Sequence, residues 1–498
     1  MKKKIRYTLS MFSLLIVSYY TQAQVSTNTN YRFEGFASVA SGDNTPFWLV
    51  NHSWGMVPLK ANNYYVRGGI FHEQKMDKNW NLSFGADVAA STSTHAYDQV
   101  WLQQLYGVLN WKSFRIKFGT QEDYTSLLDP YLSSGDLSFS NNARPIPELK
   151  LSLSDFVLVP YTSGTLYIKG NCSIGKFMDG NYLERTTQTR FRYSKNVLLH
   201  NKSIYFRFGN FDQNDHLRFT FGLNDQTQWG GEIYEPYDGG VTYVAHGFQD
   251  FINTFFAKVG GTGSTGIDQL YVEGNHAGDW LFKLDYKSTP TDIYSLYLQH
   301  YFEDGSGLGF ENYPDMLLGI QYNKEEPGLL SGFVFEYIYM KQQTGAIHFN
   351  LEMDEEHAKI RNKGNGNDDY YNHFDYQQGR SYYGRSLGSP LFLSPEYNDD
   401  GRINFKDSRF ISFHVGMGGY LHPDWEYRLL ASYGKGYGRY YVPFTKVKTG
   451  LAAGLDLIYT FPQVTGLDIK LSVGFDQGEF FRGDTFGGAF SIRKSGIF

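Results

Sequence analysis

The chain has 498 residues, of which 18% are aromatic and 19% are charged, and its formal net charge is -6. This modest negative charge is spread along the chain and creates no basic field, which argues against nucleic acid as a partner. A mean hydropathy of -0.42 combined with 40 Tyr, 40 Phe and 54 Gly is typical of a membrane β-barrel, whose strands face lipid on one side and a wet lumen on the other. On composition alone, a soluble β-helix or propeller is the alternative.

The first residues have the pattern of a secretory signal peptide. A cationic start at residues 2–6 precedes the apolar run 8–17, which is shorter than the roughly 20 residues of a spanning helix. Small side chains near the end of this segment predict cleavage after Ala23, so that residues 1–23 are removed. We therefore expect an exported protein.

Residues 24–62 are predicted to form a short N-terminal periplasmic cap or barrel plug. Their central part, 44–58, contains two prolines and clustered aromatic residues, a composition that disfavours regular strand. The rest of the mature chain, 63–498, contains no linker or fixed-period repeat, and we expect it to form one transmembrane barrel.

Two-residue alternation recurs along the chain and is clearest at 467–475. Apolar residues at odd positions alternate there with Asp468, Lys470, Ser472 and Gly474. Charges on the second face recur too often for a sandwich core, where each unpaired charge costs several kcal/mol. The predicted fold class is therefore all-β, an antiparallel transmembrane β-barrel.

The connections between these segments alternate between tight and long. Residues 77–79 and 325–328 are predicted tight turns, as on the periplasmic side of outer-membrane barrels. The longest irregular stretch, 350–408, is rich in Asn, Asp, Gly and Tyr and is predicted to be an external loop. Loops of this length are usually functional or disordered.

The sequence ends on Phe498, with Phe490 and Ile492 upstream in the same two-residue register. A terminal aromatic residue that closes an amphipathic strand is a feature that outer-membrane insertion machinery reads. We predict the cell outer membrane as the location, with that machinery and outer-membrane lipid as partners.

Aromatic and polar side chains crowd the long loop. Aromatic faces can stack on the apolar face of a sugar, while guanidinium, amide and carboxylate groups bond its hydroxyls. The alternative, that the tyrosines pack the loop against itself and the barrel rim, is equally open. The candidate glycan-binding residues are Tyr370, Tyr371, Tyr376, Arg380, Tyr382, Tyr383, Arg385 and Trp229.

The negative net charge would repel an acidic polymer unless local cations offset it. Arg380, Arg385 and Arg402 are the residues predicted to do so.

Several short motifs resemble those of nucleotide or metal sites, but the residues in or around them do not fit such a site. The sequence 261–266 fits GxGxxG, but a dinucleotide site needs a helix after this motif, and residues 267–273 are predicted to form a strand. Phe177 occupies the position where a phosphate loop needs Ser or Thr. Acidic residues at 354–356 and 368–369 are better explained as a solvated loop than as a calcium site. We expect no catalytic residue, no cofactor and no metal.

Several motifs, in this order and spacing, resemble the Wzi-type capsule assembly proteins. They are Thr45–Leu49 with its continuation to Pro58, Gly175–Phe177, Leu198–Ser203, Phe221–Leu223 with Gln228–Gly231, Asp369–Asn372, Tyr383–Gly384 and Gly388–Leu391. The resemblance implies an outer-membrane barrel of about 18 strands that acts as a lectin for capsular or exopolysaccharide and organises it at the cell surface. Better-known members have an N-terminal helical bundle, whereas residues 24–62 show no sustained helical period. A porin-like channel for oligosaccharides or small solutes is the alternative function.

Overall fold

The structure is a computed structural model. It describes residues 27–91, 99–188, 190–211, 215–266, 268–269, 272–303, 305–343 and 368–498. The predicted signal peptide, its cleavage site and residues 350–367 of the predicted loop lie outside this part of the chain.

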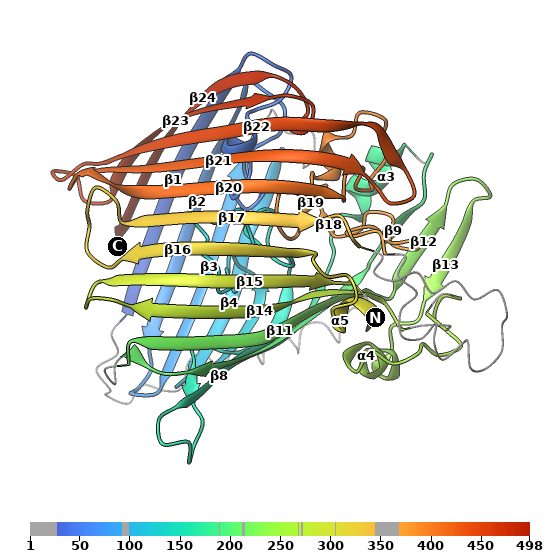
Figure 1. The fold of residues 1–498 in the computed structure, drawn as a ribbon, viewed down its shortest axis with the longest axis horizontal. Helices are drawn as coiled ribbons and strands as arrows, with labels where there is room; N and C mark the ends of the chain where they lie inside the picture. Colours follow the sequence, from blue (N-terminus) through green and yellow to red (C-terminus); the bar gives the residue numbers. More distant parts are fainter. Residues whose placement is uncertain are drawn as a thin grey trace, which may run out of the picture.

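A single antiparallel sheet of 18 strands closes on itself as a barrel (Figure 1). Neighbouring strands follow chain order, and the last strand pairs with the first from Asn30–Ile497 to Ala40–Gly487. The strands of the ring are β1 (Thr27–Ala40), β2 (Asn63–Lys75), β3 (Trp80–Ala90), β4 (Val100–Trp111), β5 (Phe114–Thr120), β6 (Glu148–Leu153), β8 (Leu166–Lys176), β10 (Leu198–Phe208), β11 (Leu217–Trp229), β14 (Asn275–Lys287), β15 (Asp292–Phe302), β16 (Met316–Lys324), β17 (Gly332–Met340), β20 (Phe410–His422), β21 (Trp425–Gly438), β22 (Pro443–Thr460), β23 (Leu467–Gln477) and β24 (Thr485–Ile497). The short β7 (Val157–Leu158) pairs with β8 beside the ring.

The two faces of each strand differ as the alternation predicts. On β23, Leu471, Val473 and Phe475 are exposed on the outside, whereas Ser472 and Asp476 are buried on the inside. The outer face thus offers apolar side chains to lipid, and the inner face offers polar ones to the lumen. Among the described helices, none is both long and apolar enough to cross a membrane.

The connections divide between the two ends of the barrel (Figure 1). The predicted turns at 77–79 and 325–328 lie at the left-hand end, where tight connections such as 288–291 also occur. The described parts of the long connections, including those after β11 and β17, lie at the right-hand end. In outer-membrane barrels short turns face the periplasm and long loops face outward. We call the right-hand end external on this basis.

The predicted boundary at residue 63 is wrong, and so is the predicted periplasmic position of the cap. Residues Thr27–Ala40 form β1, which pairs with both β2 and β24 and belongs to the ring. The aromatic and proline-rich part is the connection from β1 to β2 at the external end, and it folds into the lumen. Polar residues dominate the first four positions of β1, so the apolar alternation that marks β23 begins only near Phe33.

Smaller elements lie within the long connections. β9, β12 and β13 form a three-stranded sheet beyond the external rim, and β18 pairs with β19. These elements are α2 (Phe47–Val50), α3 (Gly180–Thr187), β9 (Tyr193–Lys195), β12 (Gly231–Glu235), β13 (Gly240–Val244), α4 (Phe248–Phe255), α5 (Gly305–Leu308), β18 (Ser381–Tyr382), β19 (Arg385–Ser386) and the 3-10 helix η2 (Pro395–Tyr397).

Candidate functional site

Three connections fold into the lumen and together form what we call the plug: residues 44–62, 121–147 and 368–409. They touch walls on different sides of the barrel. Trp48 packs on Gly454 of β22, and the backbone N–H of Leu137 donates to Gln299 Oε1 on β15 over 3.1 Å. The plug therefore crosses the interior of the barrel.

The plug has an aromatic core of its own. The rings of Tyr371 and Phe392 stack with centroids 3.8 Å apart and an interplanar angle of 11°, and Phe405 meets Tyr371 edge-on at 5.1 Å. The Tyr371 hydroxyl donates to the Leu137 carbonyl, which ties segment 368–409 to segment 121–147. Burial of these rings stabilises the plug as a packed unit rather than as a set of loose loops.

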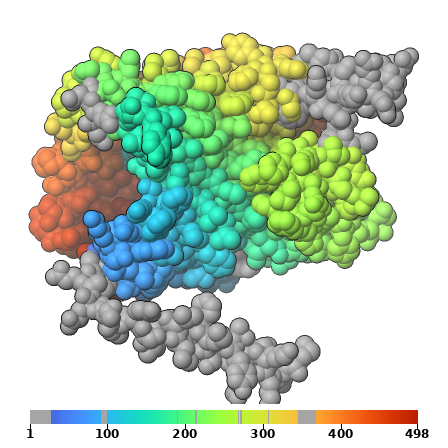
Figure 2. Space-filling model, turned by 90° about the horizontal axis from the view of Figure 1, so that it is seen from below, coloured from blue at the N-terminus to red at the C-terminus, as the bar shows by residue number. Residues whose placement is uncertain are grey.

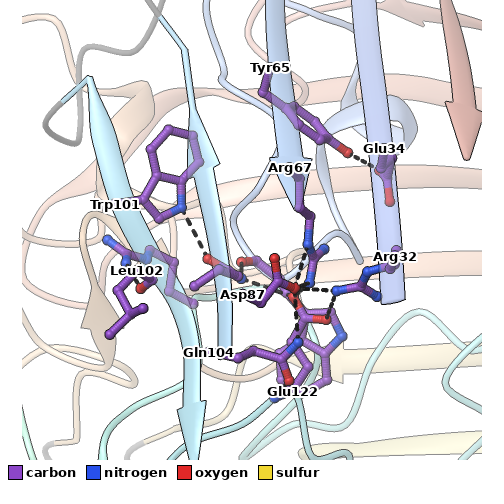
Figure 3. Close-up of polar contacts among 12 residues, drawn as sticks. Arg32, Glu34, Tyr65, Arg67, Asp87, Trp101, Leu102, Gln104 and Glu122 are labelled. Atoms are coloured by element: carbon purple, nitrogen blue, oxygen red, sulfur yellow. Dashed lines mark hydrogen bonds and ion pairs between the residues drawn. The ribbon is translucent and has the colours of Figure 1, made fainter. Parts of the chain in front are cut away.

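Charged side chains on the inner wall anchor the plug. Figure 3 shows Arg32 from β1 and Arg67 from β2 reaching Asp87 on β3. Arg67 Nη2 also donates to Glu122 Oε1, at the start of segment 121–147, over 2.7 Å. A lumen lined by such charges holds a polar plug by hydrogen bonds, which satisfies groups that would otherwise be buried without partners.

A second anchor lies across the barrel, on β17. Glu336 accepts hydrogen bonds from Ser133 Oγ at 2.7 Å, from the Ser134 N–H at 2.8 Å and from Tyr297 OH at 2.6 Å. One buried carboxylate thus holds two plug residues and one wall residue.

A cavity of about 340 Å³ remains between the plug and the wall strands β1 and β21–β24. Its lining includes two ion pairs of the wall, Arg428–Asp456 at 2.5 Å and Arg493–Asp468 at 2.8 Å. Such a lining suits water and small ions.

The structure places most of the predicted glycan-binding residues inside the protein. Buried are Tyr370, Tyr371, Tyr376, Arg380, Tyr382, Arg385 and Trp229, whereas Tyr383 is half-buried. This burial favours the alternative that the sequence left equally open, in which the tyrosines pack the loop against the protein, for all but Tyr383. Whether any of them contacts sugar stays a prediction. The buried residues of the loop lie in the lumen, which accepts a polar and aromatic composition as readily as a surface does, whereas Trp229 of β11 lies beside Phe251 of α4.

The two buried arginines bind protein groups. Arg380 donates to the Gln226 side chain on β11, and Arg385 Nη2 donates to the Val57 carbonyl over 2.9 Å. Arg385 also forms an ion pair with Glu396 at 2.5 Å. The prediction that they offset charge at the surface is wrong, because their guanidinium groups are engaged inside the plug. Arg402 does lie at the surface, with 55% of its side chain exposed.

The external end carries a group of aromatic and cationic side chains, two of them exposed and two half-buried, that were not among the predicted site residues. Phe374 is 61% exposed, and the Arg192 guanidinium lies over its ring at 4.5 Å. Arg402 lies over Phe191 in the same way at 4.8 Å. We call Phe191, Arg192, Phe374 and Arg402 the external aromatic surface.

Beside this surface, β9 and β12 present a stacked pair. Tyr193 and Tyr234 have ring centroids 5.0 Å apart and an interplanar angle of 4°, and Lys195 Nζ lies 5.2 Å from the Tyr234 ring. Each hydroxyl donates to a carboxylate: Tyr193 to Glu184 and Tyr234 to Glu232. Burial and the Glu184 contact raise the pKa of Tyr193 to about 12, so its hydroxyl remains a donor across the physiological range.

The charges of this region are paired. Arg192 forms ion pairs with Glu235 and, at 3.6 Å, with Asp375, and Arg402 pairs with Asp400 at 3.4 Å. The surface therefore offers donors and acceptors side by side. Such a mixture suits a hydroxyl-rich ligand, which both donates and accepts hydrogen bonds.

These residues were missed because they come from different connections. Phe191 and Arg192 follow α3, whereas Phe374 and Arg402 belong to segment 368–409. The available sequence signal is the polar, aromatic-rich composition of the connections 177–197 and 230–274.

The acidic residues of the long loop are engaged where the structure describes them. Asp369 pairs with Arg439 and accepts from Ser408 Oγ at 3.0 Å. Residues 354–356 lie outside the described residues. Within the described ranges, no three His, Cys, Asp or Glu side chains are grouped to hold a metal ion.

Comparisons with known proteins agree with this architecture. The curated proteins contain no significant match. Among solved structures, the chain is similar to Wzi of Escherichia coli, described as an outer-membrane protein involved in group 1 capsule assembly and a carbohydrate-binding β-barrel. The TM-score is 0.55 at 11% identity, covering 98% of this chain and 86% of that one. This likeness shows the fold.

More distant barrels include two of Pseudomonas aeruginosa, OccK5 and OpdK. They have TM-scores of 0.47 and 0.49 and identities of 9% and 8%. The match to OccK5 covers 95% of this chain and 98% of OccK5. The match to OpdK covers 95% of this chain and 99% of OpdK. A family model, capsule assembly protein Wzi, matches residues 53–393, which includes most of the plug and more than half of the barrel. This outer-membrane barrel therefore belongs to the Wzi family of capsule assembly proteins.

Proposed function

We propose that this protein binds capsular or exopolysaccharide non-covalently at its external end and helps to hold it at the cell surface. The barrel is the rigid platform in this proposal, and no bond of the polysaccharide is broken or made. The observation that carries it is the exposed Phe374 ring beside Arg192 at the external end. The carbohydrate binding described for the similar E. coli protein supports it.

The external aromatic surface has the chemistry that sugar recognition requires. The Phe374 ring offers an apolar face, while the half-buried Arg192 and Glu235 beside it offer a donor and an acceptor. A pyranose ring has the same two aspects, an apolar C–H face and a rim of hydroxyls. The half-buried Tyr234, which is stacked on the buried Tyr193, extends this chemistry along β12.

The test is retention of the producer's own polysaccharide by purified protein in detergent. Phe374→Ala removes the exposed face, and we expect binding to weaken roughly two- to tenfold, as for loss of one stacking contact. Tyr161→Ala is the matched control, because Tyr161 is fully exposed in the turn 159–165 at the opposite end of the barrel. Equal binding by both variants, or no retention by the native protein, would contradict the proposal.

The second function, a channel for oligosaccharides or small solutes, is less compatible with the plug. Plug residues contact β15 on one side and β22 on the other, and the described cavity of about 340 Å³ is bounded by plug residues such as Trp48. The conductance experiment in the Discussion separates the two functions.

A further inference from the structure

The outer face of the barrel carries a buried charged group near the external rim. Lys202 of β10 lies 2.8 Å from Asp225 of β11, and His276 of β14 lies 3.2 Å from the same carboxylate. These residues share a face with the lipid-exposed Ile204, two positions along β10. Charges on the lipid side of a barrel strand are costly, so they need a cover or a position near the interface.

Helix α4 provides this cover. The rings of Phe251 and Phe255 lie 5.4 and 5.2 Å from the ring of His200, and Lys202 Nζ donates to the Phe255 carbonyl. Phe251 also lies 6.1 Å from the ring of Trp229. In Figure 2 the connection that contains α4, in yellow-green, stands out from the body of the molecule. The helix therefore lies against the outer wall, at the external end of the strands.

Helix α4 buries polar side chains and exposes aromatic ones, whereas a helix on the surface of a soluble protein does the opposite. Its buried residues are Asn253 and Thr254, and Asn253 Nδ2 donates to Glu273 over 2.9 Å. Phe248 is 80% exposed and Phe256, at the C-cap, is 60% exposed. Residues four apart share one side of a helix, so Phe248, Ile252 and Phe256 form an outward apolar stripe.

We propose that this stripe is inserted into the outer leaflet of the membrane, so that α4 is an interfacial helix. Helices of this kind bury an apolar face roughly 5–10 Å into the boundary between headgroups and acyl chains. We assign lipid as the occupant because the stripe continues the lipid-facing surface of the barrel. Phe251 and Phe255 of α4 pack on the outward face of β10, and the exposed Ile204 follows on the same face of that strand. Lys258, which lies over the Phe256 ring at 5.6 Å, is placed to reach headgroup phosphates.

The neighbouring connection repeats this arrangement. Phe310 stacks on the outward-facing His300 at 4.4 Å and lies 6.2 Å from the ring of Trp280, whose indole N–H donates to the Leu308 carbonyl over 3.2 Å. Phe310 and Tyr313 remain exposed. Two adjacent connections thus extend an apolar belt around this side of the external rim, as aromatic girdles do at membrane interfaces.

The experiment measures contact with lipid by quenching. Cys172 is replaced by Ser, and one cysteine at a time is introduced as Phe248→Cys or Gln249→Cys and labelled with an environment-sensitive fluorophore. The full-length protein is reconstituted into phosphatidylcholine–phosphatidylglycerol vesicles that contain lipids with a spin label near the headgroup end of the acyl chain. Gln249 is the matched control, since it is exposed on the same helix but lies outside the stripe.

We expect the label at 248 to be quenched at least twofold more than the label at 249. Equal quenching at the two positions, or none at 248, would overturn the proposal. So would crosslinking of two copies through position 248 in the vesicles, since a second chain would then occupy the stripe. The heat-dependent shift of the barrel on gels shows that each labelled variant is folded. Quenching by spin-labelled lipid does not depend on polysaccharide binding, so this experiment tests the inference independently of the proposed function.

Discussion

Arg67 on the wall strand β2 and Glu122 at the start of a plug segment lie 2.7 Å apart, and Arg67 at the same time binds Asp87 on β3 at 2.6 Å. The Arg67 side chain is 6% exposed. One guanidinium thus joins two adjacent wall strands to the plug.

Loss of this arginine is expected to destabilise the protein severely. Arg67→Ala removes the buried cation between Asp87 and Glu122; Arg32 still reaches Asp87, so we expect the lower part of the about 3–5 kcal/mol that breaking a buried pair from one side costs. Thermal unfolding in detergent, followed by circular dichroism, measures the effect. Arg493→Ala is the control: its side chain is 49% exposed and pairs with Asp468, so a loss below about 1 kcal/mol is expected. Similar losses in both variants would show that Arg67 is not a special anchor.

Tyr371 allows its structural role to be separated from sugar contact. Tyr371→Phe keeps the stack on Phe392 and removes only the hydrogen bond to the Leu137 carbonyl, so we expect a loss of about 1 kcal/mol in unfolding free energy. Retention of polysaccharide should be unchanged, because the ring is buried. Weaker retention of polysaccharide with an unchanged free energy of unfolding would instead indicate that Tyr371 contacts sugar.

The connection that follows α4 should loosen as pH rises. Burial, with smaller effects of Asp375 and Glu273, raises the pKa of Asp268 to about 7, against an ordinary value near 3.9 when unfolded. Between these two values the folded segment holds a proton that the unfolded segment releases. The stability of the segment therefore falls from pH 4 to pH 7 and is lowest above pH 7.

Hydrogen exchange of residues 256–274, measured from pH 5 to 8 and corrected for the intrinsic rate, checks this. Asp268→Asn should reduce the pH dependence to what Glu273, whose pKa burial also raises, contributes, whereas the exposed Asp399→Asn should leave it in place. A protection that is flat with pH in the native protein would contradict the expectation.

The plug should make the native protein electrically silent. In planar bilayers we expect no large steady current, because segments 44–62, 121–147 and 368–409 all lie inside the ring. Replacing residues 126–142 by a short Gly-Ser linker removes contacts of the plug with Glu336 and Gln299, and stepwise currents should follow. Shortening the hairpin turn 236–239, which lies beyond the rim, is the control. Large steady currents from the native protein would favour the channel.

The barrel itself was predictable because alternation is a property of single strands. Leu471, Val473 and Phe475 alternate with polar residues in sequence and face opposite sides in the structure. β1 was missed for a related reason: it begins Thr27-Asn28-Thr29-Asn30, polar on both faces, and is assigned by its pairing with β2 and β24. The pairing of two strands that lie far apart in the chain cannot be read from the sequence of either strand alone.

The site was harder to predict because the polar lumen and the external surface contain the same types of residue. Tyr370 and Arg380 have the composition of an exposed loop, yet both are buried among polar partners such as Asn312 and Gln226. Phe374, four residues after Tyr370, is exposed. Nothing in the local sequence separates these neighbours, since their environment is set by walls and connections elsewhere in the chain.

The closure of β1 on β24 has a consequence for the order of assembly. The Phe47 N–H donates to Asp476 Oδ2 over 2.8 Å, and Trp48 rests on Gly454, so an early segment docks on strands made last. Phe47 and Trp48 have no such surface until β22 and β23 have joined the barrel. Docking of this part of the plug therefore depends on the same strands that close the wall.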